Sequence, residues 1–101
     1  MNSVRRKIAV SVDSTVVAAK GQVAADLGKE TVILHLKNAF YYGLNEMGTR
    51  VWNLIQNPRK VFGIRNVLVE KYDVDPKLCE RDVVALLEDL AAEGLIEVKN
   101  G

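Results

Sequence analysis

The stretch ETVILHLKNAFYYGLNEMGTRVW, residues 30–52, decides the fold, because the spacing of its apolar side chains changes halfway along it. Apolar residues alternate with a period of two over residues 30–37, and again over residues 40–44, where aromatic residues are frequent. Both patterns are typical of β-strands. Lys37-Asn38 between them predicts a tight turn, since Asn tolerates the left-handed backbone conformation. The first part of this stretch therefore predicts a β-hairpin.

The alternation also divides the first strand of this hairpin into two faces. Val32, Leu34 and Leu36 share one face. Ile33 and His35 lie on the opposite and less apolar face, where we expect the histidine to be solvated or loosely hydrogen-bonded.

Three helices are expected after the hairpin. The first begins at Asn45, a favoured N-cap residue, and ends before Pro58, which disfavours helical geometry in the preceding residue. The second is predicted by apolar residues at steps of three and four over residues 61–72. The third begins at Pro76, directly after a capping carboxylate, and stops at Gly94.

Shorter strand signals flank these elements. Residues 22–27 predict a strand that joins the hairpin through a turn at Gly28, residues 95–98 a short final strand, and the alternation of residues 7–12 a short strand or arm. The order predicts an α+β fold in a single domain, residues 1–101. Its expected architecture is an N-terminal three-stranded antiparallel sheet followed by a three-helix winged helix-turn-helix with a short C-terminal strand.

Composition excludes several classes of protein. The chain has 101 residues, is 49% hydrophobic and 27% charged, and has one cysteine and one histidine. Neither a disulfide framework nor a multi-cysteine or two-histidine metal site can be built from these. A nucleophilic Cys79 would need His35 as its base, and the position of Cys79 in the apolar stripe of the third helix favours a buried role. We expect no catalytic residue, no metal and no cofactor, and hence a binding protein rather than an enzyme.

The sequence carries no signal for a membrane. The longest aliphatic run is five residues, Val83–Leu87, against about 20 for a membrane span. The basic cluster near the start of the chain is not followed by an apolar stretch. We therefore expect a cytoplasmic protein that contacts no membrane.

A winged helix-turn-helix suggests DNA binding, but the charge of the third helix opposes it. This helix would enter the major groove, and it carries Glu80, Asp82, Glu88, Asp89 and Glu93 against Lys77 and Arg81. Helices that read DNA release counterions with Lys and Arg. DNA regulation therefore stays an alternative, and we expect no nucleic-acid partner.

Peptide binding and a plain core role explain the remaining pattern equally well. The strand of residues 39–44 has no Lys, Glu or Pro that would block an incoming strand at its outer edge. Val84 and Ala91 form an apolar shoulder on the third helix beside Leu87, and Glu80 shares this shoulder. An open edge beside an apolar shoulder suits β-strand addition, in which backbone hydrogen bonds supply affinity and pockets select side chains. The other interpretation is that these side chains only form the core.

Two segments resemble the PqqD-like family. In VILHLKNAFYYGLNEMGTRVW the family pattern of an aromatic-rich strand ending in Leu-Asn, then Gly and Trp, is found at Tyr41, Tyr42, Leu44, Asn45, Gly48 and Trp52. KYDVDPKLCERDVVALLEDLAAEGLIEV is similar to the closing helix of the family at Asp82, Leu86, Leu87, Leu90, Gly94 and Leu95. The two segments together cover about half of the chain.

This resemblance implies a function. PqqD-like domains bind the leader of a ribosomally made precursor peptide as an extra strand against their third strand, in a groove shared with the third helix, and present it to a modifying enzyme. The size of the chain and its YYGLNEMGTRVW and YDVDP stretches look most like the small partner proteins of lasso-peptide clusters. There a separate cysteine protease removes the leader and an ATP-dependent cyclase closes the ring. Pyrroloquinoline-quinone proteins are the nearest relatives, and a peptide chaperone of that pathway is a further alternative.

The resulting prediction is a non-catalytic leader-binding site. Its residues are Phe40, Tyr41, Tyr42, Gly43, Leu44, Glu80, Val84, Leu87 and Ala91, whereas Leu44, Met47, Trp52, Leu86 and Leu90 are assigned to the core. Which aromatic residue of the third strand faces the groove stays open. Glu80 and Asp82 at the rim favour a leader with a basic residue nearby. The expected partners are the precursor leader peptide and a leader peptidase or other modifying enzyme, with a homodimer through the same open edge as another use of it.

Overall fold

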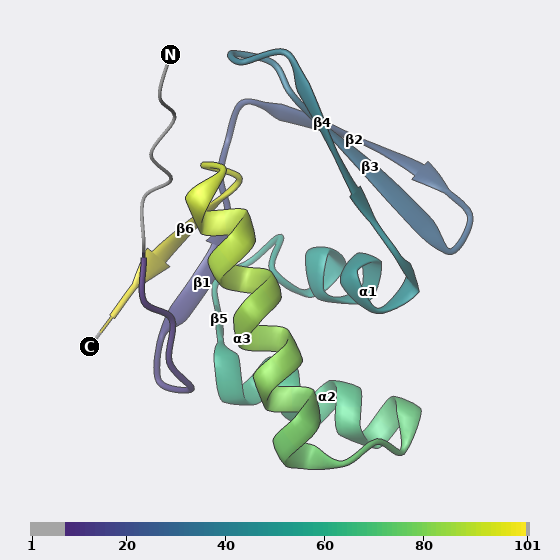
Figure 1. The fold of residues 1–101 in the computed structure, drawn as a ribbon, viewed down its shortest axis with the longest axis vertical. Helices are drawn as coiled ribbons and strands as arrows, with labels where there is room; N and C mark the ends of the chain where they lie inside the picture. The colour runs from purple at the N-terminus through teal and green to yellow at the C-terminus, as the bar shows by residue number, and fades with distance from the viewer. Residues whose placement is uncertain (1–7, 101) are drawn as a thin grey trace.

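The computed structural model describes residues 8–100 and contains two antiparallel sheets and three helices (Figure 1). The elements in chain order are β1 (Thr15–Ala18), β2 (Gln22–Leu27), β3 (Glu30–His35), β4 (Phe40–Leu44), α1 (Glu46–Leu54), β5 (Arg59–Lys60), α2 (Val61–Tyr72), α3 (Pro76–Ala92) and β6 (Ile96–Lys99). One sheet has the order β2-β3-β4 and the other β5-β1-β6. The predicted α+β class is confirmed.

The β2-β3-β4 sheet is the predicted three-stranded meander. Leu27 pairs with Glu30 across a two-residue turn, and Gly28 in that turn has a φ of +82°. A positive φ at the first turn residue suits the right-handed twist of the flanking strands, and glycine adopts it without a steric penalty. Thr31 pairs with Leu44 and His35 with Phe40, so β3 is central and β4 is an edge strand.

The loop between β3 and β4 differs from the predicted tight turn. It has four residues, 36–39, and the left-handed conformation is adopted by Ala39, with a φ of 53°, rather than by Asn38. The Ala39 amide donates to the His35 carbonyl at 2.7 Å, which closes the loop. A Cβ in this region costs about 1–2 kcal/mol, so the loop is strained at Ala39.

The first strand lies later than the sequence predicts. Residues 8–11 form no strand, Lys7 lies outside the described residues, and β1 begins only at Thr15. Ser11 and Ser14 form a turn in which the Ser14 amide donates to the Ser11 carbonyl at 3.0 Å and the Ser11 amide donates to Ser14 Oγ at 2.9 Å. Hydroxyl side chains favour such turns, and the β-branched residues that follow favour a strand.

The three helices begin and end close to the predicted residues. Asn45 Oδ1 accepts from the Gly48 amide at 2.9 Å at the start of α1. Asp75 Oδ2 does the same for the Leu78 amide at the start of α3, where Pro76 occupies the first turn. Gly94 follows α3 with a φ of +75°. No helix within residues 8–100 is long and apolar enough to cross a membrane.

The face of β3 that packs on the core is the less apolar one by sequence. Ile33 is fully buried and Thr31 is 5% exposed, whereas Leu36, just beyond β3, is 55% exposed. The reason is tertiary, because α1 packs against β3 on the Ile33 side, and Leu44 of β4 adds to the same side. His35 shares this face and stacks on Phe40, with ring centroids 5.1 Å apart.

Candidate functional site

The first feature of the site is the outer edge of β4. Within the described residues, β4 pairs with β3 on one side and no strand pairs with its other side. An edge strand directs alternate backbone N–H and C=O groups outward, where another chain can pair with them. Tyr41 and Gly43 point away from the core, and neither adds a charge or a proline to this edge.

The orientation of the β4 aromatic residues is now defined. Phe40 and Tyr42 pair with His35 and Ile33, so they lie on the face turned toward α1, and both are partly buried. Tyr41 lies on the opposite face and is 76% exposed. Side chains between β4 and α3 can therefore meet Phe40 and Tyr42, whereas Tyr41 belongs to the outer surface of the sheet.

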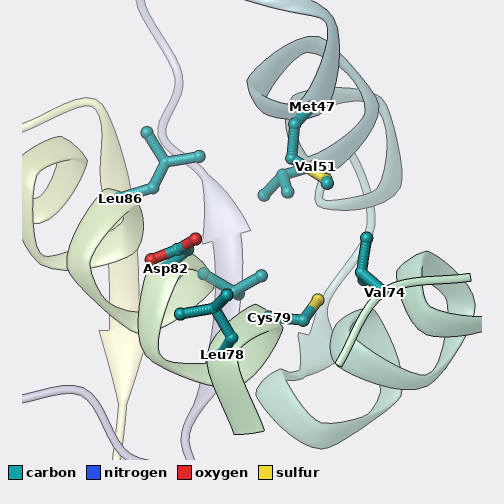
Figure 2. A pocket seen from close by; sticks show the side chains of 8 residues that line it. Met47, Val51, Val74, Leu78, Cys79, Asp82 and Leu86 are labelled. Atoms are coloured by element: carbon teal, nitrogen blue, oxygen red, sulfur yellow. The ribbon is translucent and has the colours of Figure 1, made fainter. Parts of the chain in front are cut away.

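The second feature is a pocket between α1, the α2–α3 connection and α3, with a volume of about 120 Å³. Figure 2 shows Met47 and Val51 of α1 on one side of it and Asp82 and Leu86 of α3 on the other. The lining residues are Met47, Val51, Val74, Leu78, Cys79, Asp82, Val83 and Leu86. Met47 lies in the first turn of α1, shortly after the last residue of β4, so one wall of the pocket follows β4 directly along the chain.

Asp82 is the one charged residue of this lining. Its side chain is 67% exposed, and its Oδ1 lies 3.7 Å from Arg81 Nε in a loose surface pair. Cys79 is 5% exposed. Burial raises the pKa of the Cys79 thiol, the negative charge of Asp82 raises it further, and Arg65 lowers it. The pocket therefore combines an apolar floor with a carboxylate at its rim.

The opposite side of α3 is tied to other parts of the molecule. Glu80 Oε1 accepts from Arg65 Nη1 of α2 at 2.6 Å, and Glu88 Oε2 accepts from the Val10 amide at 3.1 Å. Val84 lies one turn from each of these acidic residues and shares their side. Two residues along a helix correspond to about 200° of rotation, which turns Val84 away from Asp82 and Leu86.

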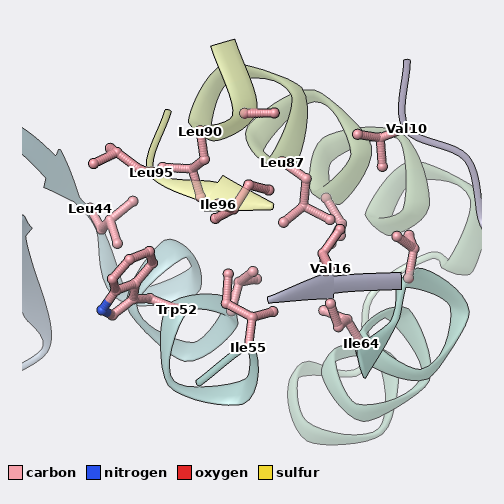
Figure 3. Close-up of a cluster of buried hydrophobic side chains, with 14 of the residues drawn as sticks. Val10, Val16, Leu44, Trp52, Ile55, Ile64, Leu87, Leu90, Leu95 and Ile96 are labelled. Atoms are coloured by element: carbon pink, nitrogen blue, oxygen red, sulfur yellow. The ribbon is translucent and has the colours of Figure 1, made fainter. Parts of the chain in front are cut away.

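Several predicted site residues lie in the core instead. Leu87 is 0% exposed and Ala91 is 4% exposed, and Figure 3 shows Leu87 and Leu90 among the buried side chains that pack against β1 and β6. Leu44, at 5% exposure, packs close to Gly48, where a Cβ would lie 3.1 Å from Leu44 Cδ2. Leu87, Ala91 and Leu44 therefore offer almost no surface to a ligand, and we place them in the core.

The structure thus joins part of the predicted site and separates the rest. It places Phe40 and Tyr42 on one face of β4 and Tyr41 and Gly43 on the other. Glu80 and Val84 lie on the side of α3 opposite the pocket. Met47 and Leu86, which the sequence assigned to the core, are partly buried and line the pocket. The signal that could have found this wall is the spacing of four between Leu78, Asp82 and Leu86, with an apolar residue in an exposed first turn.

The structure gives no support to a Cys79–His35 pair. His35 Nδ1 accepts from the Asn38 amide at 3.2 Å while its ring stacks on Phe40, and Cys79 lies at the pocket between α1 and α3. Over residues 8–100, no group of three or more His, Cys, Asp or Glu side chains is placed to hold a metal ion.

Comparisons with known proteins match most of the chain. The family model described as coenzyme PQQ synthesis protein D (PqqD) matches residues 30–96. The structure of TbiB1 in complex with the TbiA(beta) leader peptide is 32% identical in sequence, with a TM-score of 0.75, and the match covers 80% of this chain and 94% of that one. No curated protein matches the chain.

Two further solved structures share the fold at lower identity. Lasso peptide synthetase B1 complexed with the leader peptide is 20% identical, with a TM-score of 0.72 over 81% of this chain and 96% of that one. The PqqD truncation of Methylobacterium extorquens PqqCD, described as a functional and stand-alone recognition element for ribosomally synthesized and post-translationally modified peptides, is 24% identical. Its TM-score is 0.74 over 88% of this chain and 95% of that one.

Proposed function

The chain belongs to the PqqD family, and we propose that it is a non-catalytic recognition protein for the leader segment of a ribosomally made precursor peptide. The leader pairs as an added strand with the outer edge of β4, Phe40–Leu44, and is presented to a leader peptidase or other modifying enzyme. The observation that carries this proposal is the edge of β4, which no described strand covers and which ends beside an apolar pocket.

Strand addition suits this edge for physical reasons. The backbone groups of an edge strand are already ordered by the sheet before a peptide binds. The conformational entropy lost on binding is therefore mainly that of the peptide. Partly buried Phe40 and Tyr42 lie on the face toward α1 and provide apolar contacts for alternate side chains of the added strand.

The similarity to TbiB1 supports a leader as the peptide. That protein was solved with the TbiA(beta) leader peptide bound, and it matches four-fifths of this chain at 32% identity. The PqqD truncation is 24% identical and supports the fold alone. We therefore favour lasso-peptide maturation over the pyrroloquinoline-quinone pathway.

The test uses β2, the other edge strand of this sheet among the described residues, as an internal control. Peptides are selected from a random phage-displayed library on the wild-type chain, and amide hydrogen exchange is measured with the tightest binder. Added backbone hydrogen bonds slow exchange, so we expect new protection at β4, Phe40–Leu44, and none at β2, Gln22–Leu27. Selection of no peptide, or protection at β2 instead of β4, would overturn the proposal.

A further inference from the structure

His35 connects the loop between β3 and β4 to two other parts of the molecule. Its Nδ1 accepts a hydrogen bond from the Asn38 amide at 3.2 Å, and its ring stacks on Phe40 with centroids 5.1 Å apart. Its Nε2 lies next to the turn after α3, 3.7 Å from the position that a Cβ on Gly94 would take. Phe40 is the first residue of β4, so the imidazole lies at the start of the edge on which the proposed function rests.

The hydrogen bond to Asn38 requires a neutral imidazole. A backbone amide can only donate, so Nδ1 presents a lone pair to Asn38 and the proton of the neutral ring is on Nε2. Imidazole side chains take up a second proton between about pH 8 and pH 5. In His35 this proton goes to Nδ1, opposite the Asn38 N–H. The doubly protonated ring has no acceptor, and the hydrogen bond is lost.

The loop that this hydrogen bond closes is strained. Ala39 adopts a φ of 53°, which is unfavourable for a residue with a Cβ. Two hydrogen bonds to His35 oppose the strain, one from the Ala39 amide to the His35 carbonyl at 2.7 Å and one from the Asn38 amide to the ring. Protonation removes the second of them. Either the loop then opens or the imidazole turns away from Asn38, and both changes shift Phe40, which stacks on the same ring.

Within residues 8–100, no salt bridge stabilises a protonated His35. The ring shares the inner face of the β2-β3-β4 sheet with Gln22, its partner in β2, and with Phe40. The charged or titratable residues on the inner face and on the elements around the ring are Asp26, Lys37, Tyr42, Glu46, Arg50 and Glu93. None of these forms an ion pair with His35. Protonation therefore removes a hydrogen bond without adding an ion pair.

We propose that His35 is a pH-sensitive switch, whose protonation releases the loop between β3 and β4, shifts Phe40 and weakens peptide binding at the start of β4. The release of the loop is a property of this chain alone, whereas its effect on binding rests on the proposed function. His35 is the one histidine of the chain, so its titration is free of interference from any other imidazole.

Two variants separate the hydrogen bond from the ring. His35→Asn keeps a side-chain acceptor for the Asn38 amide, because an asparagine Oδ1 lies close to the position of a histidine Nδ1, and it takes up no proton. His35→Phe keeps an aromatic ring against Phe40 and removes the acceptor. Nuclear magnetic resonance of the unbound chains records the imidazole signals and the amide exchange rates between about pH 8 and pH 5. Circular dichroism checks that each variant is folded.

The exchange rates of Asn38 and Ala39 are taken relative to those of His35→Asn at each pH, which cancels the intrinsic pH dependence of exchange. In the wild type we expect this ratio to rise about fivefold as the pH falls, with the midpoint of the His35 imidazole. Affinity for a library-selected peptide without histidine should fall by about the same factor. His35→Asn should bind tightly at both ends of the pH range, and His35→Phe weakly at both.

The outcomes separate the switch from the proposed function. An exchange ratio that does not follow the imidazole, or a loss of affinity at low pH that persists in His35→Asn, would overturn the switch. The wild-type titration decides this point even if a variant does not fold. If the ratio follows the imidazole but the library yields no peptide, the proposed function fails and the loop transition stands. If peptide affinity is the same across the range while the ratio changes, the effect of the loop on binding is refuted.

Discussion

The two sides of α3 contain similar residues and make different contacts. One side, Glu80, Val84 and Glu88, is held by Arg65 of α2 and by the backbone of Val10, and we call it the clasped side. The other side, which we call the pocket side, consists of Leu78, Asp82 and Leu86 and faces α1 across the pocket. Both sides combine aliphatic and acidic residues, one valine with two glutamates on the clasped side and two leucines with one aspartate on the pocket side, so residue types alone do not show which side is covered. Their contacts differ: α3 is held by hydrogen bonds on one side and borders the pocket on the other.

The largest expected effect is on the pocket side. Leu86→Arg removes an apolar wall of the pocket and places a cation next to the expected basic residue of the peptide. Truncation of a central anchor contact typically costs more than 2 kcal/mol, so we expect a loss of affinity of about a hundredfold. Fluorescence anisotropy with a labelled, library-selected peptide measures it, and unchanged affinity would remove the pocket side from the site.

The matched change on the clasped side should act on stability. Val84 is partly buried and lies between the Arg65–Glu80 pair and the Glu88–Val10 contact. Val84→Arg should lower the free energy of unfolding by about 1–3 kcal/mol, because a partly buried site must accommodate a larger, charged side chain. Urea denaturation measures this change. If Val84→Arg instead weakens peptide binding as much as Leu86→Arg at unchanged stability, the assignment of the two sides is wrong.

The pKa of the Cys79 thiol depends on charges on both sides of α3. Desolvation and Asp82 raise the pKa of its thiol, whereas Arg65 of the clasped side lowers it. The thiolate is the reactive form, so labelling by iodoacetamide should continue to rise with pH beyond the point near pH 8.5 where the labelling of an ordinary thiol begins to level off. A bound peptide should slow labelling further, and mass spectrometry measures both rates. A plateau near pH 8.5, or no slowing by peptide, would contradict this placement.

The same pKa shift predicts the direction of a stability change. Because the pKa is raised in the folded chain, the protonated thiol favours folding, and its contribution is fully present below the pKa of the unfolded thiol. The contribution is lost as the pH rises through the folded pKa. Cys79→Ala is the control, since it removes this part of the pH dependence.

The smallest effect is expected for the ion pair of the clasped side. Glu80 and Arg65 are 2.6 Å apart, but their side chains are 37% and 27% exposed. Exposed pairs contribute about 0.2–1 kcal/mol, so Glu80→Gln should lower the free energy of unfolding by about 0.5 kcal/mol and leave peptide affinity unchanged. The loss should decrease in 1 M salt because of screening; a salt-independent loss would mean that Glu80 acts by packing alone.

Much of the fold could be predicted from local sequence patterns. The hairpin, the meander and all three helices could be predicted, because alternation, the Asn45 cap, Pro76 and Gly94 act on the backbone within a few residues. The open edge of β4 was likewise predicted from a strand without blocking residues. The left-handed residue of the β3–β4 loop was assigned to Asn38 instead of Ala39, since loop length was not fixed by the local pattern.

The remaining features depend on contacts between distant residues. β1 pairs with β5 and β6, so its position could not be inferred from four residues alone. The core face of β3 was set by where α1 packs, and this buried Ile33 in place of Leu36. For α3, helical spacing identified the apolar positions, but only the partners Arg65 and Val10 show which side is covered.

The arrangement of the two sheets also separates the β4 edge from the places where another module could be attached. Asn100 Nδ2 donates to the Ala9 carbonyl at 3.2 Å, and Ser14 Oγ donates to Asn100 Oδ1, so the first and last described segments meet beside the β5-β1-β6 sheet. In Figure 1 this junction lies on the far side of α3 from the β2-β3-β4 sheet. Another protein module or an affinity handle fused near residue 9 or residue 100 would therefore lie behind α3, where it would not obstruct a peptide at the β4 edge.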